Sequence, residues 1–419
     1  MTFEELNLIE PLMKAVKNRG YITPSPIQEK AIPHVLSGVD VFGCAQTGTG
    51  KTAAFSLPIL QLIQQKQHNK QQAHIKALVL APTRELALQI HESFVEYGKG
   101  LPIKSTVIFG GVSQLNQTNA LKRGVDILIA TPGRLIDLMN QGYVDLRHIE
   151  FFVLDEVDRM LDMGFIADIR RVIAKIPLKR QTLFFSATVP PDIKKLADSL
   201  LKNPVQVHVA PISTAAEMVK QTIFHVEKND KVNLLKHILN EQNVDHALVF
   251  TRTKHGADKV VKDLKKSGIS AEAIHGNKSQ NARQRALKDF KDRTLKILVA
   301  TDIASRGIDV DKLTHVFQFD LPEVPETYIH RIGRTGRAGM DGIAISFCAS
   351  EERDYLKGIN KLLNGAIESV DAGKYQSTVR DYTPSPKVVQ ARPSSSNRRQ
   401  FNNAPSRPKN YQRNTAKQS

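Results

Sequence analysis

Tryptophan is absent from this chain of 419 residues, and cysteine occurs only twice, at Cys44 and Cys348. The two cysteines lie far apart in separate apolar stretches, a pattern that predicts two buried small residues rather than a disulfide or a zinc site. No apolar run reaches the roughly 18 residues that a membrane-spanning helix needs. Residues 1–11 carry three glutamates and lack the basic and then apolar pattern of a signal peptide, so we expect a cytoplasmic protein.

Acidic residues are too few to balance the basic ones. The chain holds 59 Lys and Arg against 42 Asp and Glu, which gives a net charge of +17 and an isoelectric point near 9.7. An imbalance of this size favours a polyanionic partner, either a nucleic acid or an anionic membrane surface. No amphipathic basic helix is visible near the C-terminus, so the sequence favours nucleic acid.

Aliphatic residues almost disappear after Val389, where Ser, Asn, Gln, Pro and Arg dominate. Such a segment cannot bury enough apolar surface to offset its chain entropy, so we predict a disordered basic tail over 373–419. Asp381 is its single acid, against ten Lys or Arg. The tail would either tether RNA, with Phe401 and Tyr411 stacking on bases, or only keep the protein soluble.

Short apolar runs recur along the rest of the chain, and each is followed by a helical pattern. This alternation predicts parallel β-sheets covered by helices, an α/β fold. The pattern pauses near Pro211 and then resumes, so we predict one domain at 31–208, a linker at 209–219 and a second domain at 220–372. The expected strands are 39–44, 77–81, 106–109, 126–130, 151–155 and 182–186 in the first domain, and 221–225, 246–250, 296–300, 315–319 and 342–347 in the second.

A glycine-rich segment follows the first expected strand and precedes a helical pattern at 53–65. Its core of Gly50, Lys51 and Thr52 matches a phosphate-binding loop, in which backbone N–H groups wrap around the β-phosphate. Lys51 would reach the β- and γ-phosphates, and the Thr52 hydroxyl would bind Mg²⁺. Ala45 stands where the standard pattern has its first glycine. The expected nucleotide contacts are Ala45, Gln46, Thr47, Gly48, Thr49, Gly50, Lys51 and Thr52.

Two acids, Asp155 and Glu156, follow the apolar run that begins at residue 151. An acid at the carboxyl end of a buried strand can hold Mg²⁺ beside the phosphates, so Asp155 is the predicted metal ligand and Glu156 the group that positions the attacking water. Acids after a strand more commonly cap a helix. The phosphate-binding loop about a hundred residues earlier favours the nucleotide site instead.

Together these motifs resemble those of the DEAD-box RNA helicases, with a tetrad that here reads Asp155, Glu156, Val157 and Asp158. The resemblance covers nearly the whole chain before the tail and implies two tandem RecA-like domains, each a mostly parallel sheet flanked by helices. It also implies an adenine-recognition segment at 1–30, in which a glutamine amide pairs with adenine and selects ATP. The residues implied there are Gln28 and, as aromatic contacts, Phe3 and Tyr21.

Further segments resemble the RNA-binding and coupling motifs of the family. The resemblance implies contacts with phosphates and 2′-hydroxyls and no reading of bases, whereas helix caps and turns are the ordinary alternative for these residue types. The implied RNA contacts are Pro82, Thr83, Arg84, Gly110, Gly111, Thr131, Pro132, Gly133, Arg134, Arg252, Gln280, Arg283 and Thr301. The residues implied to couple the nucleotide state to domain closure are Asp158, Ser186, Ala187, Thr188 and His330.

Three arginines at a spacing of three residues make the segment 330–337 the most specific feature of the chain. Two glycines break this segment, which suits neither a core nor a plain basic surface. The resemblance implies that Arg334 and Arg337 act on the γ-phosphate held by the opposite domain, a role worth roughly 10³- to 10⁵-fold in related phosphoryl transfer. It also implies that Asp309 contacts the ribose.

Val157 departs from the family, which has alanine at this position. Overpacking of a buried site typically costs ~1–3 kcal/mol, so we expect ATP hydrolysis that is retained but slowed.

The resemblance implies an RNA-dependent ATPase that uses ATP and Mg²⁺ to open a few base pairs without processive translocation. Two alternatives stay open: an ATP-dependent RNA clamp that rarely unwinds, and a translocase stimulated by single-stranded DNA. Composition and the short tail further resemble the RhlE-like bacterial branch. On that basis we expect a monomer with a role in ribosome assembly or RNA turnover, and ribosomal precursors or RNA-degradation proteins as partners.

Overall fold

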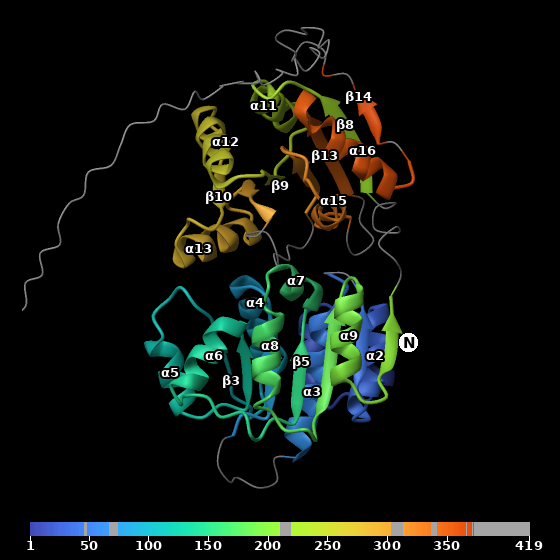
Figure 1. Cartoon of the computed structure of the whole chain (residues 1–419), viewed down its shortest axis with the longest axis vertical. Coiled ribbons are helices and arrows are strands. Elements are labelled where there is room, and N and C mark those ends of the chain that lie inside the picture. Colours follow the sequence, from blue (N-terminus) through green and yellow to red (C-terminus); the bar gives the residue numbers. More distant parts are fainter. Residues whose placement is uncertain are drawn as a thin grey trace, which may run out of the picture. The chain divides into compact units, whose positions relative to one another are not determined.

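The computed structural model describes residues 1–45, 48–66, 74–209, 219–302, 313–336, 342–365, 367–370 and 372. Several predicted features lie outside these residues: Gln46, Thr47, Asp309, Arg337, residues 210–218 of the expected linker, and the tail from 373 onward. The described residues up to 209 form a first lobe, and those from 219 to 372 form a second lobe, each built on its own sheet (Figure 1).

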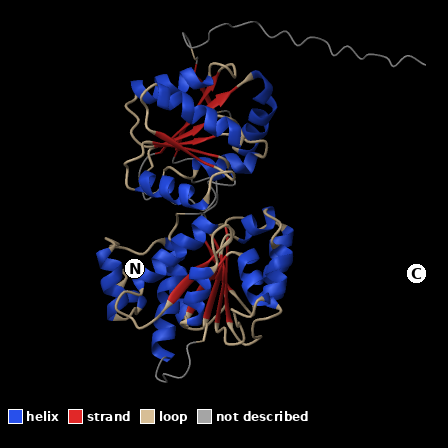
Figure 2. Ribbon diagram, turned by 90° about the vertical axis from the view of Figure 1, so that its left-hand side faces the viewer, coloured by secondary structure: helices blue, strands red, loops and turns tan. Residues whose placement is uncertain are grey.

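The first lobe is a seven-stranded parallel sheet with helices on both faces (Figures 1 and 2). Its strand order is β3-β4-β2-β5-β6-β1-β7, with β1 (Val41–Cys44), β2 (Ala77–Leu80), β3 (Ser105–Ile108), β4 (Ile127–Ala130), β5 (Phe151–Leu154), β6 (Gln181–Ser186) and β7 (Val205–His208). Its helices are η1 (Glu4–Leu6), α1 (Glu10–Asn18), α2 (Pro26–Leu36), α3 (Lys51–Lys66), α4 (Arg84–Tyr97), α5 (Leu115–Lys122), α6 (Pro132–Asn140), α7 (Val157–Asp162), α8 (Ile166–Ile173) and α9 (Pro191–Leu200).

The second lobe is also a seven-stranded parallel sheet between helices. Its strand order is β10-β11-β9-β12-β13-β8-β14, with β8 (Val219–His225), β9 (Ala247–Phe250), β10 (Ala271–Ile274), β11 (Ile297–Ala300), β12 (His315–Gln318), β13 (Gly342–Cys348) and β14 (Glu368–Val370). The described helices are α11 (Lys231–Glu241), α12 (Lys254–Lys266), α13 (Gln280–Lys291), α15 (Pro325–Ile332), η2 (Ser350–Glu352) and α16 (Arg353–Leu362).

The two sheets share one topology, because adding seven to each strand number of the first sheet gives the order of the second. Both cores are layered on the two faces of their sheets. In β2, for example, Ala77 and Val79 pack into one buried cluster and Leu78 and Leu80 into another, as expected for a strand whose successive side chains point to opposite faces. Burial on both faces explains why these strands appear in the sequence as continuous apolar runs.

All of the predicted strands are present, with ends that agree to within two residues. The sequence did not reveal β7, β10 or β14, which are short edge strands or contain exposed polar residues. Strand β8 begins at Val219, so the predicted linker extended one residue too far. Cys348 is buried as expected, but Cys44 is only partly buried, which corrects that prediction. Among the described residues, no helix has both the length and the apolar character to cross a membrane.

Candidate nucleotide and RNA sites

The described part of the predicted phosphate-binding loop, residues 48–50, leads into α3, which begins at Lys51. Gly50 has a φ of +92°, which disfavours other residues, and a Cβ there would approach the Ser25 hydroxyl to 2.9 Å and collide with the Gln28 amide. The loop is held by the adenine-recognition segment, because the Ser25 hydroxyl donates to the Thr49 carbonyl at 2.7 Å and the Gln28 amide to the Gly50 carbonyl at 3.2 Å. Both the positive φ and the lack of room for a Cβ therefore require a glycine at position 50.

The three residues expected to contact adenine differ in their exposure. The amide of Gln28 is engaged at both ends, since its oxygen accepts from the Ser25 backbone at 3.0 Å and its nitrogen donates to Gly50. Phe3 is buried in the core and stacks against Tyr21, with 6.4 Å between ring centroids. Tyr21 is 38% exposed and lines the nucleotide cavity described below. Of these two aromatic rings, Tyr21 is therefore the one accessible to a ligand, and Phe3 packs against it from the core.

Lys51 and Asp155 face each other, with Lys51 Nζ 3.8 Å from Asp155 Oδ1. Both side chains are buried, and no hydrogen-bond partner exists among the described residues for Lys51 Nζ, Asp155 Oδ1 or Glu156 Oε1. Buried charged atoms of this kind are costly unless a ligand satisfies them. They line a cavity of about 400 Å³ together with Gly48, Gly50, Thr52, Tyr21 and, from the second lobe, Arg334.

Glu156 has a left-handed backbone with φ +55° and ψ +52°, which is uncommon for a residue other than glycine. Its Oε2 accepts from Arg159 Nη1 at 2.8 Å, so the carboxylate is held in place on one side while Oε1 stays available. Burial raises the pKa of the neighbouring Asp155, with Lys51 opposing the rise and Glu156 adding to it. A cation next to Asp155 would therefore relieve a buried charge.

The oxygens of Thr52 and Asp155 fit a Mg²⁺ ion of the kind that accompanies a nucleotide. Such an ion takes one or two protein oxygens and fills its other positions with phosphates and water. The described residues contain no group of three His, Cys, Asp or Glu that could hold a metal by themselves. The donor set therefore suits a metal that arrives with a phosphate ligand.

Asp158 connects the tetrad to the segment after β6. Its Oδ2 accepts from the backbone of Ala187 at 3.1 Å and of Thr188 at 2.9 Å, and its own backbone N–H donates to the Ser186 hydroxyl at 3.3 Å. These contacts bring together the residues that the sequence assigned to coupling. His330 joins them, because a cavity of about 380 Å³ is lined by Asp158, Thr188 and His330. Burial, and next the charge of Arg159, lower the pKa of His330 below its usual value.

Of the arginines in segment 330–337, the structure describes Arg331 and Arg334, which make different contacts. Arg331 is buried and forms a bidentate pair with Asp302, with Nε–Oδ1 and Nη2–Oδ2 distances of 2.5 and 2.8 Å. This pair fixes α15 to the segment after β11. Arg334 donates from Nε to the His330 carbonyl at 3.3 Å and reaches the cavity that Lys51 and Asp155 line.

The RNA segments of the first lobe meet around a cavity of about 580 Å³. Its lining includes Pro82, Thr83, Arg84, Gly110, Thr131, Gly133 and Arg134, which come from three segments separated in the sequence. Arg84 lies against Gly111, whose φ is +76°. Thr83 caps α4 by accepting from Leu86 N at 3.2 Å, whereas Thr131 makes no capping hydrogen bond with its side chain at the start of α6. The capping alternative therefore applies to Thr83 and not to Thr131.

Two of the second-lobe residues expected to contact RNA, Gln280 and Arg283, contact Glu85 of the first lobe. Glu85 was not singled out from the sequence. The Gln280 amide donates to Glu85 Oε1 at 3.0 Å, and Arg283 Nη2 lies 3.0 Å from the same oxygen. Thr301 follows β11, and its backbone N–H donates to the Ile274 carbonyl at 3.3 Å. Glu85 is 3% exposed, and because the burial of an acid is decided by the folded structure, the sequence could not have revealed these contacts.

Comparison with known proteins identifies the family of this chain. The family model described as DEAD/DEAH box helicase matches residues 25–196, and the helicase conserved C-terminal domain matches residues 230–339. The chain belongs to the DEAD-box family of helicases, which are ATP-driven enzymes. It is 43% identical over 362 residues to the ATP-dependent RNA helicase CshA of Limosilactobacillus reuteri, covering 86% of this chain and 72% of that protein. It is 42% identical over 361 residues to the DEAD-box ATP-dependent RNA helicase CshA of Bacillus subtilis, with the same coverage of 86% and 72%.

Solved structures confirm the fold of two RecA-like domains. The Mss116p structure bound to single-stranded RNA and AMP-PNP superposes with a TM-score of 0.79 at 31% identity, covering 88% of this chain and 79% of that one. Dbp5 of S. cerevisiae bound to RNA and ADP BeF3 gives 0.76 at 33% identity, covering 88% and 95%. The predicted RhlE-like branch is not supported, because these bacterial relatives carry the name CshA, a different branch.

Proposed function

We propose that this chain is an ATP-dependent RNA helicase that opens short stretches of duplex or remodels RNA–protein complexes. The observation that carries the proposal is the set of buried, unsatisfied atoms on Lys51, Asp155 and Glu156 around one cavity beside Arg334. A triphosphate is the ligand class whose charge and oxygens would satisfy the lysine and, with a metal, the two acids.

The proposed roles follow from the positions of the described side chains, except those of Arg337 and Asp309, which follow from the resemblance of the sequence alone. Lys51 and the backbone N–H groups of the glycine-rich loop bind phosphate oxygens, and Thr52 and Asp155 hold Mg²⁺, which neutralises charge on the phosphates when it is bound. Glu156, held by Arg159, orients the attacking water. Arg334 and Arg337 stabilise the negative charge that develops on the γ-phosphate, and Asp309 contacts the ribose.

Domain closure would gate the reaction, because the phosphate-binding loop belongs to one lobe and the arginines to the other. RNA held along the three first-lobe segments and by Arg252, Gln280, Arg283 and Thr301 would favour closure, and the hydrogen bonds between Asp158 and Thr188 would transmit the nucleotide state. The cytoplasmic location, the monomeric state and the role in ribosome assembly or RNA turnover stay predictions.

ATP hydrolysis measured without nucleic acid, with single-stranded RNA and with single-stranded DNA tests the proposal, next to displacement of a short RNA strand. Replacing Lys51 by methionine should lower RNA-stimulated hydrolysis by about 10²-fold or more. Lys66→Met at the other end of α3, where the exposed lysine pairs with Glu150, is the matched control and should leave the rate unchanged.

Each alternative gives a different result. Hydrolysis that does not respond to RNA would contradict the coupling of the two lobes. RNA-stimulated hydrolysis without strand displacement would identify an RNA clamp, and equal stimulation by single-stranded DNA would identify a translocase.

A further inference from the structure

The second lobe contains a counterpart of the nucleotide site. Because the two sheets share one strand order, β8 and α11 correspond to β1 and α3, and Lys231 begins α11 just as Lys51 begins α3. Asp320 corresponds to Asp155, since each donates its backbone N–H to the last residue of the neighbouring strand, at 3.2 Å to Phe250 and 3.0 Å to Leu80. Lys231 lies 3.5 Å from Asp320, as Lys51 lies 3.8 Å from Asp155.

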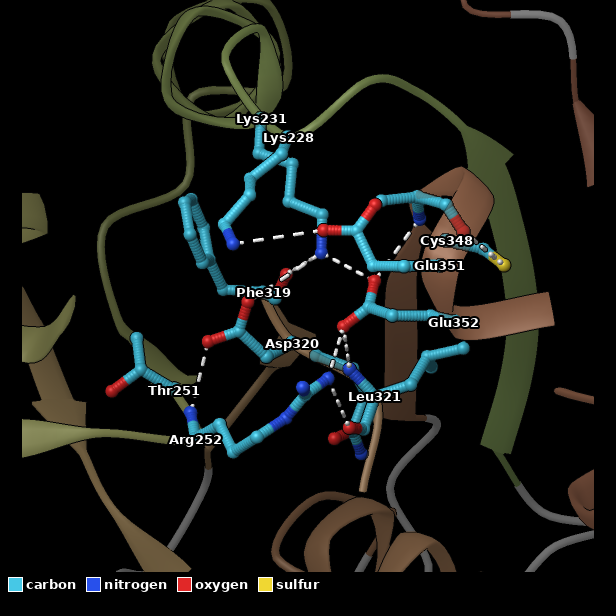
Figure 3. A network of polar contacts seen from close by, with 12 residues as sticks. Lys228, Lys231, Thr251, Arg252, Phe319, Asp320, Leu321, Cys348, Glu351 and Glu352 are labelled. Carbon is cyan, nitrogen blue, oxygen red and sulfur yellow. Dashed lines mark hydrogen bonds and ion pairs between the residues drawn. The ribbon is translucent and has the colours of Figure 1, made fainter. Parts of the chain in front are cut away.

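The two lysines differ in what satisfies them. Lys231 Nζ donates to the Phe319 carbonyl at 2.7 Å, to Glu352 Oε2 at 2.6 Å and to Asp320 Oδ1 at 3.5 Å, so its three hydrogens meet three acceptors (Figure 3). Lys51 Nζ, by contrast, has no hydrogen-bond partner in the described part of the chain. The carboxylate of Glu352 therefore occupies the position in which a phosphate would satisfy the lysine.

Glu352 extends from this pocket to the β9–α12 loop. The side chain is 2% exposed and uses both oxygens: Oε2 accepts from Lys231 and from the Ala349 backbone at 3.0 Å, and Oε1 accepts from Arg252 Nη2 at 2.7 Å and from the Leu321 backbone at 3.2 Å (Figure 3). Four donors thus fix one buried carboxylate. Because this carboxylate is fixed, the Arg252 guanidinium can keep its hydrogen bond to Glu352 Oε1 in only a narrow range of orientations.

The β9–α12 loop that carries Arg252 corresponds to the first-lobe RNA segment at Thr83. Thr253 caps α12 by accepting from Gly256 N at 3.0 Å, in the same way as Thr83 caps α4. The Arg252 backbone is fixed as well, since its N–H donates to Asp320 Oδ2 at 2.9 Å. The guanidinium carbon Cζ of Arg252 lies over the Tyr355 ring, 5.2 Å from the ring centroid, and the Arg252 side chain is 35% exposed.

The surroundings of Arg252 suit an anion. A cavity of about 440 Å³ next to it is lined by Lys228, Lys236 and Lys259 as well as by Asp263 and Asp320. Asp263 is paired with Lys266, Asp320 is occupied by Lys231 and the Arg252 backbone, and Lys228 is paired with Glu351. Lys236 and Lys259 therefore give the cavity its positive charge beside Arg252. A phosphodiester is the anion that an RNA strand would bring to this loop.

We propose that Glu352 and Lys231 are positioning residues: the counterpart of the nucleotide pocket in the second lobe serves as a fixed support that aims Arg252 at an RNA phosphate. This inference rests on the proposed function and deepens it. Lys231 neutralises Glu352, and Glu352 orients Arg252 through Nη2, so that Nε and Nη1, which make no hydrogen bond within the described residues, are presented to the strand.

The test measures ATP hydrolysis against RNA concentration in the full chain, with variants Glu352→Gln, Arg252→Ala and the double variant. Asp354→Asn is the matched control, because this acid two residues further along is exposed and pairs with Lys357 at 2.9 Å, outside the cavity lining. We expect Arg252→Ala to raise the RNA concentration for half-maximal stimulation by about tenfold, the effect of one charge-assisted contact, and Glu352→Gln to raise it several-fold. In Glu352→Gln the KM for ATP and the rate at saturating RNA should stay unchanged.

A positioning role makes the two substitutions non-additive, so Glu352→Gln should add nothing in the Arg252→Ala background. Additive effects would overturn the inference, and so would an unchanged or lower half-maximal RNA concentration in Glu352→Gln. If Glu352→Gln fails to fold, Lys231→Met combined with Glu352→Gln removes the buried charge as a pair and gives the same readout. Absence of RNA stimulation in the unsubstituted chain would instead refute the proposed function.

Discussion

One carboxylate oxygen of Asp158 accepts two hydrogen bonds from Thr188, from its backbone N–H at 2.9 Å and from its hydroxyl at 3.1 Å. Oδ1 of the same carboxylate accepts from Arg159 N at 3.0 Å. Both carboxylate oxygens of Asp158 thus accept hydrogen bonds. The carboxylate, which has no hydrogen to donate, joins the tetrad to the segment after β6.

Asp158→Asn is therefore expected to be damaging although it changes the shape little. Whichever way the amide is turned, its NH₂ faces an N–H group, and an unsatisfied buried group costs about 1–3 kcal/mol. We expect a lower free energy of unfolding and slower RNA-stimulated hydrolysis, measured by thermal unfolding and ATPase assay. Asp198→Asn, which affects an exposed pair with Lys194, is the control; equal effects of the two variants would contradict this role for Asp158.

Gly111→Ala should weaken RNA binding, whereas Gly110→Ala should not. A Cβ on Gly111 would collide with the Arg84 guanidinium, and its φ of +76° costs another residue about 1–2 kcal/mol. At Gly110 the nearest atom to a new Cβ is Arg84 Nη2 at 3.8 Å, an ordinary contact. RNA affinity measured by fluorescence anisotropy separates the two variants, and equal affinities would show that the position of Arg84 does not matter.

Val157→Ala tests the expectation that valine overpacks the tetrad. Val157 is fully buried in a cluster with residues such as Leu154, Met160 and Phe184, and losing its methyl groups would cost about 1.5 kcal/mol if the site is well packed. If the valine is well packed, Val157→Ala should have a lower free energy of unfolding and an unchanged rate of ATP hydrolysis. Strain predicts the reverse, a more stable and faster variant. Val95→Ala, at an exposed position on α4, is the control for unfolding by denaturant.

Acid should destabilise the second lobe through His246. Its Nε2 donates to the Phe290 carbonyl at 2.9 Å, its Nδ1 is buried without a partner among the described residues, and burial lowers the pKa of the ring. The unfolded chain therefore takes up the proton first, so the free energy of unfolding falls as the pH drops below about 6.5, by at most about 1.4 kcal/mol per pH unit. His246→Gln should reduce this slope, and an unchanged slope between pH 7 and 5 would contradict it.

Removing the residues after Gly373 distinguishes an RNA-tethering tail from a solubilising one. If the tail tethers RNA, its removal should raise the RNA concentration needed for half-maximal ATPase stimulation. The RNA affinity should also depend less on salt, because each lost phosphate contact lowers the slope of log affinity against log salt concentration by about 0.7. A tail that only maintains solubility would leave both unchanged. Replacing Phe401 and Tyr411 by alanine in the full chain tests stacking without altering the charge.

The amino-acid sequence by itself determined the α/β class, all but three of the described strands and the division into two lobes, and it predicted the glycine, lysine and acids that line one cavity. It could do so because strands buried on both faces need continuous apolar runs, and because phosphate binding needs glycine, lysine and acids at fixed places relative to strands. Both requirements concern residues that are close together in the sequence, so they can be recognised without the tertiary structure.

Only the tertiary structure decided which charges are satisfied. Lys51 and Lys231 begin corresponding helices, yet one has no hydrogen-bond partner among the described residues and the other is neutralised by Glu352, which lies 121 residues away in the sequence. The engagement of Gln28 with Gly50, the burial of Phe3 and the contact of Glu85 with Arg283 likewise depend on segments that folding brings together. The free energy of a buried charge depends on its neighbours in space, and for these residues the neighbours are distant along the chain.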